Sequence, residues 1–168
     1  MDSDNRNEYA AVIDIPACTI PRRLGVSMHG DVVTCIDFLP ETEELKSPEN
    51  SGAKKVVSEL MSYFKNPSFR FTIQAQPAGS DFRKNVWKAL KNIPAGDTRS
   101  YGDIADMLDS SARAVGGACR DNPVPIIIPC HRVIARNGFG GYSGKTDGWE
   151  LEFKRWLLNH ENQNGHNS

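Results

Sequence analysis

The hydrophobic positions in the first half of the chain mostly follow the alternating pattern of strands. Residues 9–15 are rich in Ala, Val and Ile, and residues 23–39 form two apolar segments around a turn at 29–31. Two such segments with a short turn between them predict a β-hairpin. Apolar residues at helical spacing predict a helix over 52–65, and the alternation over 69–73 predicts another strand.

The second half has the period of helices, with a serine before each of three short ones. Ser80, Ser100 and one of Ser110 or Ser111 are placed as N-caps, because a serine hydroxyl accepts a hydrogen bond from the first helical turn. Two short helices joined by a tight turn predict a helix-turn-helix. A last helix is expected after Asp147, a possible N-cap, with an apolar face of Trp149, Phe153, Trp156, Leu157 and His160.

The change of period predicts two domains. Residues 74–79 combine Gln, Ala, Pro and Gly, a composition typical of a linker. We therefore expect an α+β protein with a small α+β scaffold domain over 1–78 and a mainly helical domain over 79–168. A chain of 168 residues is long enough for two small domains.

The charge of the chain is unevenly distributed. The whole chain has 20 basic and 21 acidic side chains and a net charge of −1, which argues against a polybasic nucleic-acid binder. Residues 110–145, however, hold five basic side chains and one acidic side chain, a net charge of +4. A local basic site in the second domain is therefore compatible with a nearly neutral chain.

Membrane, secreted and metal-binding classes are not expected. No apolar run approaches the roughly 20 residues of a membrane span, and the polar first residues lack a secretory signal. The cysteines contain no Cys-x-x-Cys pair and, with the turn residue His29, form no recognisable zinc set, so we predict no metal. We expect reduced thiols in the cytoplasm, or in the nucleus of a eukaryote. The four cysteines are Cys18, Cys35, Cys119 and Cys130.

The helix expected over 112–120 contains two adjacent glycines, Gly116 and Gly117. Each costs about 1 kcal/mol relative to Ala within a helix. A tight helix crossing or an early helix end would explain them, and so would close approach of the backbone to a ligand. Arg113 and Arg120 are seven residues apart and flank the glycines. This face suits sequence-independent binding to a phosphate backbone, even in the narrow minor groove of DNA.

Three prolines frame an apolar run that ends in Cys130-His131-Arg132. A cysteine becomes a nucleophile when a base or a positive field lowers the pKa of its thiol. His131 is adjacent, Arg132 adds positive charge, and Glu161 is an acid near the end of the last helix. Since neighbouring side chains usually point apart, His131 would act through a water or a turn. From these residues alone, an inert Cys-His pair remains an equal alternative.

The motif Pro129-Cys130-His131-Arg132-Val133 closely resembles the active-site motif of the O6-alkylguanine-DNA alkyltransferases, or methylated-DNA–protein-cysteine methyltransferases. The resemblance covers about residues 79–161, in the family's order, and is highly specific. It implies a ribonuclease H-like N-terminal domain followed by a domain with a winged-helix-like helix-turn-helix. The other matching segments are Ile93-Pro94-Ala95-Gly96, Ser100-Tyr101-Gly102, Arg113-Ala114-Val115-Gly116, Asn122-Pro123, Tyr142-Ser143-Gly144 and Trp156-Leu157-Leu158-Asn159-His160-Glu161.

The resemblance implies a reaction and roles for its residues. The alkyl group on O6 of guanine, or on O4 of thymine, would move from duplex DNA to the Cys130 thiolate. Each molecule would react once, and no cofactor would be needed. His131 would act as the base through a water, and Glu161 would orient it. Tyr101 would help to rotate the nucleotide out of the duplex and protonate the leaving guanine, and Asn122 would brace the active-site turn.

The resemblance also implies the surfaces that bind DNA. Arg113 would enter the duplex where the damaged nucleotide has left it. The partner would be double-stranded DNA containing O6-alkylguanine, bound by a monomer away from any membrane. The DNA-binding residues would be Arg113, Ala114, Gly116, Gly117 and Arg120, and those of the base pocket Cys119, Pro125, Tyr142, Ser143 and Gly144.

Three features depart from the family pattern. Arg83 stands where the family often has Gln, and Ser143 where many members have Ala. The stretch from Lys145 to Phe153 is longer than in compact members. The four-cysteine regulatory domain of some bacterial relatives is absent, so we do not expect a transcriptional role.

Three alternatives make different predictions. A non-enzymatic lesion binder of the same family would lack the acceptor cysteine, which is present here as Cys130. A helix-turn-helix regulator would prefer one operator sequence. A cysteine hydrolase built on Cys130 and His131 would turn over an acyl substrate and would not need Arg113.

Overall fold

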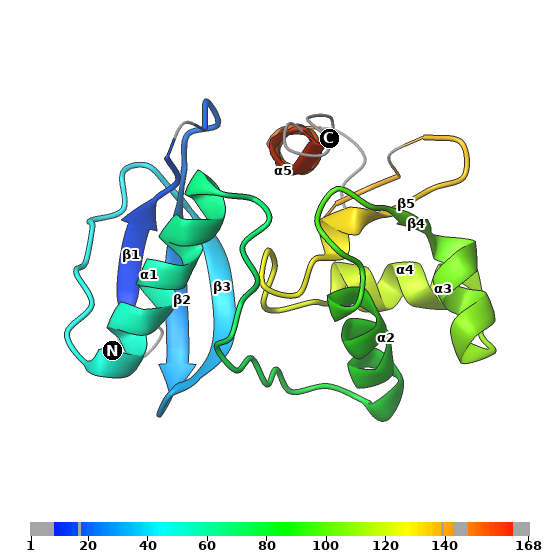
Figure 1. Cartoon of the computed structure of the whole chain (residues 1–168), viewed down its shortest axis with the longest axis horizontal. Coiled ribbons are helices and arrows are strands. Elements are labelled where there is room, and N and C mark those ends of the chain that lie inside the picture. The colour runs from blue at the N-terminus through cyan, green and yellow to red at the C-terminus, as the bar shows by residue number, and fades with distance from the viewer. Residues whose placement is uncertain (1–8, 17, 139, 143–147, 163–168) are drawn as a thin grey trace. The chain divides into compact units, whose positions relative to one another are not determined.

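The computed structural model describes residues 9–16, 18–138, 140–142 and 148–162 (Figure 1). The chain forms two compact units, Met1–Pro77 and Ala78–Ser168. Each unit has buried apolar side chains of its own, for example Leu24 and Leu60 in the first and Leu90 and Leu157 in the second.

The first unit is an antiparallel sheet covered by one helix. Strands β1 (Ala11–Asp14), β2 (Arg22–His29) and β3 (Val32–Pro40) lie in the order β1-β2-β3, which confirms the hairpin. Gly30 forms its turn with a φ of 60°, a conformation that glycine adopts without strain. Helix α1 (Ser51–Lys65) packs on the sheet (Figure 1).

The predicted strand over residues 69–73 is wrong. The carboxylate of Glu59 on α1 accepts hydrogen bonds from the backbone N–H groups of Thr72 and Ile73 at 2.8 and 3.2 Å. These donors are therefore satisfied by a side chain rather than by a neighbouring strand. Only Ala75, beyond this segment, makes an isolated bridge to Val33 of β3.

The second unit is mainly helical, and its three predicted caps are confirmed. Ser80, Ser100 and Ser111 each accept a hydrogen bond from the first turn of their helix. Asp147, the cap expected for the last helix, lies outside the described residues. The helices are α2 (Asp81–Lys91), α3 (Tyr101–Leu108), α4 (Ala112–Arg120), the 3₁₀ turn η2 (Cys130–Arg132) and α5 (Trp149–Asn162).

A short parallel strand pair connects the helices to the turn that carries the cysteine. Strand β4 (Arg99–Ser100) pairs with β5 (Val133–Ile134), with Arg99 opposite Val133. Because α3 begins directly after β4 and β5 begins directly after η2, this pairing brings the start of α3 close to the Cys-His-Arg turn. Among the described helices, none is both long and apolar enough to cross a membrane.

Candidate active site

The outer face of α4 is smooth and positively charged. Val115, Ala118 and Cys119 are buried, whereas Arg113 and Arg120 are exposed. A Cβ added at Gly116 would meet nothing within 4 Å, and one added at Gly117 would meet only the Arg120 guanidinium, at 3.8 Å. The glycines therefore do not serve a tight helix crossing, and the helix continues past them to Arg120.

Helix α2 holds the C-terminal end of α4. Trp87 donates a hydrogen bond from Nε1 to the backbone oxygen of Ala118 at 2.9 Å. Arg83 pairs through Nη2 with Oδ2 of Asp121, the C-cap residue of α4, at 2.6 Å. The arginine that departs from the family pattern thus forms an ion pair with the end of the candidate DNA-binding helix.

The segment between α4 and η2 is held by Asn122. Its Nδ2 donates to the Ile128 oxygen and its Oδ1 accepts from the Val124 N–H, both at 2.9 Å. Ile126 in the same segment is buried and has a φ of 74°. Such a conformation costs a β-branched residue roughly 1–3 kcal/mol, so the surrounding contacts hold the segment in a strained shape.

Cys130 lies at the start of η2 and is 7% exposed. Burial raises the pKa of its thiol, against the opposite effects of a hydrogen bond from Asn122 and the positive charge of Lys154. The resting group is therefore a thiol, and a base must remove its proton before it can attack. The sequence suggested Arg132 as the nearby cation, but Arg132 has a different partner.

That partner is Glu161 of α5, whose side chain is 1% exposed. Arg132 donates from Nε to Oε1 at 2.9 Å and from Nη2 to Oε2 at 2.8 Å. Its Nη1 donates to the Ile93 oxygen at 2.6 Å. Burial alone would raise the pKa of Glu161, but His131 and Arg132 hold it well below its usual range, so the group is a carboxylate.

The contact between His131 and Glu161 fixes the tautomer of the imidazole. His131 is fully buried, with Nε2 2.7 Å from Oε2 of Glu161. Burial lowers the pKa of His131 although Glu161 opposes this, so the ring is neutral at pH 7. A carboxylate can only accept a hydrogen bond, so Nε2 carries the proton and Nδ1 carries the lone pair. Within the described part of the chain, this Nδ1 has no hydrogen-bond partner.

Sequence reasoning missed Lys154, a fully buried lysine of α5. Its Nζ donates to the backbone oxygens of Val133 at 2.8 Å and Gly141 at 2.9 Å. Burial lowers the pKa of this ammonium to about 8. The available signal was spacing, because residues seven apart share one helix face and Lys154 precedes Glu161 by seven.

Comparisons with known proteins identify the family of this chain. The model of the 6-O-methylguanine DNA methyltransferase DNA-binding domain matches residues 81–163. A methylated-DNA–protein-cysteine methyltransferase of Mycobacterium tuberculosis is 41% identical over 128 residues, which cover 72% of this chain and 78% of the relative. The chain belongs to the methylated-DNA–protein-cysteine methyltransferase family.

Other members of the family agree with this assignment. The methylated-DNA–protein-cysteine methyltransferase of Methanosarcina mazei is 40% identical over 134 residues, covering 76% of this chain and 82% of its own. The crystal structure of Mycobacterium tuberculosis OGT in complex with DNA has a TM-score of 0.74 and 37% identity, over 90% of this chain and 92% of that one. The mixed α/β fold is that of the family, as expected.

The structure places most of the predicted site residues of this methyltransferase. Tyr101 begins α3, and burial raises the pKa of its hydroxyl to about 12. Tyr142 is buried, edge-on to Phe153 at 6.3 Å between ring centroids. Cys119 and Pro125 are also buried. Ser143 and Gly144 lie outside the described residues.

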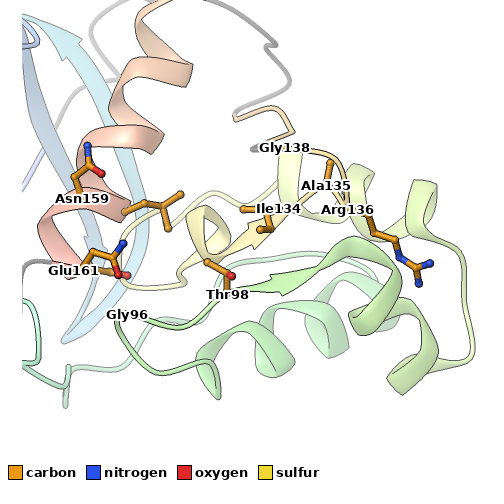
Figure 2. Close-up of a pocket in the computed structure, with 10 residues that line it drawn as sticks. Gly96, Thr98, Ile134, Ala135, Arg136, Gly138, Asn159 and Glu161 are labelled. Carbon is orange, nitrogen blue, oxygen red and sulfur yellow. The ribbon is translucent and has the colours of Figure 1, made fainter. Parts of the chain in front are cut away.

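A cavity of about 490 Å³ lies beside this site. Figure 2 shows it between the end of α5, the segment that follows β5 and the segment before β4. Its lining includes Glu161 but not Cys130, so it is not the predicted base pocket. Among the residues that the structure describes, no three His, Cys, Asp or Glu side chains form a group that could hold a metal ion.

Proposed function

We propose that this protein repairs DNA directly, by moving the O6-alkyl group of a guanine in duplex DNA to Sγ of Cys130. The observation that carries the proposal is the buried thiol of Cys130, which is followed in the chain by a buried, neutral His131 whose Nδ1 lone pair has no partner among the described residues. Such a pair suits deprotonation of the thiol during the reaction, with a water between the two groups.

The reaction is an in-line displacement on the alkyl carbon. His131 takes the thiol proton through a water at Nδ1, and the carboxylate of Glu161 stabilises the positive charge on the ring. The carbon–sulfur bond forms as the carbon–oxygen bond to guanine breaks. The product is a thioether, which thiol exchange does not reverse, so each molecule acts once. O4-alkylthymine would react in the same way.

Tyr101 protonates the leaving guanine. Its hydroxyl is protonated at pH 7, since burial raises a pKa that already lies far above 7, so it can donate a hydrogen bond to the negative charge that develops on the leaving guanine. Asn122 acts as the brace of the turn, supported by its two hydrogen bonds across it.

The DNA-binding surface is the outer face of α4. The open space above Gly116 supports close approach to the sugar–phosphate backbone in the minor groove, and Arg113 fills the place of the flipped nucleotide. The residues of this surface are Arg113, Ala114, Gly116, Gly117 and Arg120. The flipped base lies in a pocket made by Cys119, Pro125, Tyr142, Ser143 and Gly144.

We assign residues 1–78 to a ribonuclease H-like scaffold domain and residues 79–168 to the acceptor domain with a winged-helix-like helix-turn-helix. The protein acts as a monomer, needs no cofactor, and works where the DNA is, in the cytoplasm or in the nucleus of a eukaryote. The antiparallel order of the first sheet supports the assignment of the scaffold domain. The β4–β5 pair beside the helix-turn-helix supports that of the acceptor domain.

Mass spectrometry tests the function. After incubation with duplex DNA that contains O6-methylguanine, the peptide with Cys130 should have gained the mass expected when a methyl group replaces the thiol hydrogen. Undamaged duplex of the same sequence is the control. Tight binding without this mass gain would instead indicate a non-enzymatic lesion binder.

Substitution of Gly116 tests the DNA-binding face. Gly116→Ala should raise the free energy of unfolding by up to about 1 kcal/mol, because a Cβ there meets nothing and Ala favours the helix. Gly116→Leu should keep the protein folded but weaken duplex binding by at least about 10-fold, because its side chain would separate the backbone of α4 from the phosphates.

Denaturant unfolding and binding titrations on a labelled duplex measure the two effects. Ala provides the matched control for Leu, since it changes the helix propensity with far less bulk. Duplex binding by Gly116→Leu as tight as that of the unsubstituted protein would show that this face does not approach DNA.

A further inference from the structure

The buried ammonium of Lys154 has no role in the transfer described so far. A buried charge is costly unless it is compensated by hydrogen bonds or an opposite charge. Lys154 is completely buried, and two of its partners are the backbone oxygens of Val133 and Gly141. No simple packing role needs a charge at this position, because an apolar side chain of the same length would fill the space.

The two carbonyl groups belong to the two segments that flank the acceptor thiol. Val133 directly follows the Cys130–Arg132 turn, and Gly141 directly precedes Tyr142. Lys154 therefore joins the exit of the turn to residues 140–142, which we call the pocket loop. Tyr142 of this loop acts on the sulfur, because its side chain is among the groups that lower the pKa of the Cys130 thiol.

The pocket loop also lies directly against Tyr101. Gly140 has a φ of 72°, and a Cβ added there would be 3.0 Å from Cε2 and 3.3 Å from the hydroxyl oxygen of Tyr101. The ammonium of Lys154 is 5.9 Å from the centre of the same ring. The loop is thus held by Lys154 on α5 and packed on the side chain proposed as the proton donor.

We propose that Lys154 is a positioning residue for alkyl transfer, whose ammonium holds the pocket loop to the segment that follows Cys130 and places it against Tyr101. This inference rests on the proposed function, because it assigns a role within the same site. Two residues on one face of helix α5 then organise the site: Glu161 orients the base His131, and Lys154 positions the pocket loop.

The charge acts within a small group of titratable side chains. Tyr101 faces the ammonium from α3, Cys119 from α4 and Cys130 from η2. Both thiols feel its positive charge. During the displacement, negative charge moves from the sulfur to the leaving guanine. A fixed cation nearby stabilises the charge in both places.

The test compares Lys154→Met with Lys154→Arg. Met retains most of the side-chain length but has neither charge nor donor, and Arg retains both with a larger head group. In single-turnover reactions with duplex DNA containing O6-methylguanine, we expect Lys154→Met to lower the rate constant at saturating DNA by about 100-fold. The half-saturating DNA concentration should change by less than about threefold, because α4 is untouched. Arg should restore part of the rate.

Lys88→Met is the matched control, because Lys88 is an exposed lysine of α2 and should leave both constants unchanged. A second readout is the rate at which iodoacetamide alkylates Cys130 as a function of pH. The midpoint should move to higher pH in Lys154→Met, a shift that loss of packing alone would not cause, and move back in Lys154→Arg.

If Lys154→Met does not fold, Gly140→Ala carries the test. The alanine would strain the pocket loop from its Tyr101 side, so it should lower the rate constant at saturating DNA and leave the half-saturating concentration unchanged. A full transfer rate in a folded Lys154→Met, or in Gly140→Ala, would overturn the proposal. Failure of the unsubstituted protein to methylate Cys130 would instead refute the function, while the alkylation midpoint still reports on Lys154.

Discussion

Replacing Cys130 by serine should abolish alkyl transfer and leave the binding of duplex DNA within about twofold of the unsubstituted protein. A serine hydroxyl has a far higher pKa than a thiol, and its oxygen is a much weaker nucleophile for an alkyl carbon. The neutral imidazole of His131 is too weak a base to generate an alkoxide in this buried site. The residues proposed to bind DNA lie on α4 and are unchanged.

Transfer and binding have to be measured separately. Transfer is followed by the loss of O6-methylguanine from the duplex and by the mass of the peptide at position 130, and binding by titration of a labelled duplex. Cys18→Ser is the control, since Cys18 lies in the first unit, and it should transfer at the normal rate. Methyl transfer by Cys130→Ser, whichever residue received the group, would disprove the assignment of the acceptor.

Replacing Glu161 by glutamine should impair both stability and catalysis. Glu161 compensates the buried side chains of His131 and Arg132, and removing one partner of a buried ion pair costs about 3–5 kcal/mol of folding free energy. The neutral amide also no longer requires Nε2 to carry the proton, so the lone pair at Nδ1 is no longer fixed. We expect the transfer rate to fall by a factor of about 10²–10⁴, the range for loss of general-base catalysis.

The stability effect has a defined pH dependence. The pKa of Glu161 is lower in the folded protein than in the unfolded chain, so its contribution is present above the unfolded pKa and is lost as the pH falls through the folded pKa. The stability difference between the unsubstituted protein and Glu161→Gln should therefore shrink in acid. Denaturant unfolding at pH 7 and at progressively lower pH measures this difference.

Glu152→Gln is the control for this experiment, because Glu152 is an exposed glutamate on the same helix. It should unfold and transfer like the unsubstituted protein. If Glu161→Gln were as stable and as fast as this control, the contact between Glu161 and His131 would have no part in the mechanism.

Local features of this chain could be predicted from sequence, and tertiary ones could not. The capping serines Ser80, Ser100 and Ser111 mark their helices because a cap acts within one turn of its own residue. The segment 69–73 alternates like a strand, yet a carboxylate from α1 takes its backbone donors. The pattern of residues 69–73 alone cannot predict a contact with Glu59, which lies 13 residues before Thr72 in the chain.

The same distinction applies to the site. The Cys-His-Arg motif identified the acceptor turn, but adjacency suggested that Arg132 acts on the thiol, whereas Glu161 engages it from 29 residues away. Lys154 was missed because the partners that hold it are backbone carbonyls. Any residue type supplies a carbonyl, so the sequence does not show what holds Lys154, and only its spacing from Glu161 on one helix face pointed to the site.

The burial of Cys130 also affects how long the acceptor thiol stays unreacted in the absence of damaged DNA. A molecule that reacts once is lost if its sulfur meets a peroxide or an unrelated electrophile first, and the thiolate is the form that such reagents attack. Keeping the sulfur protonated and 7% exposed preserves it during the wait for a lesion. The burial that makes the reaction with DNA depend on deprotonation of Cys130 thus also protects the unreacted protein from oxidation and from other electrophiles.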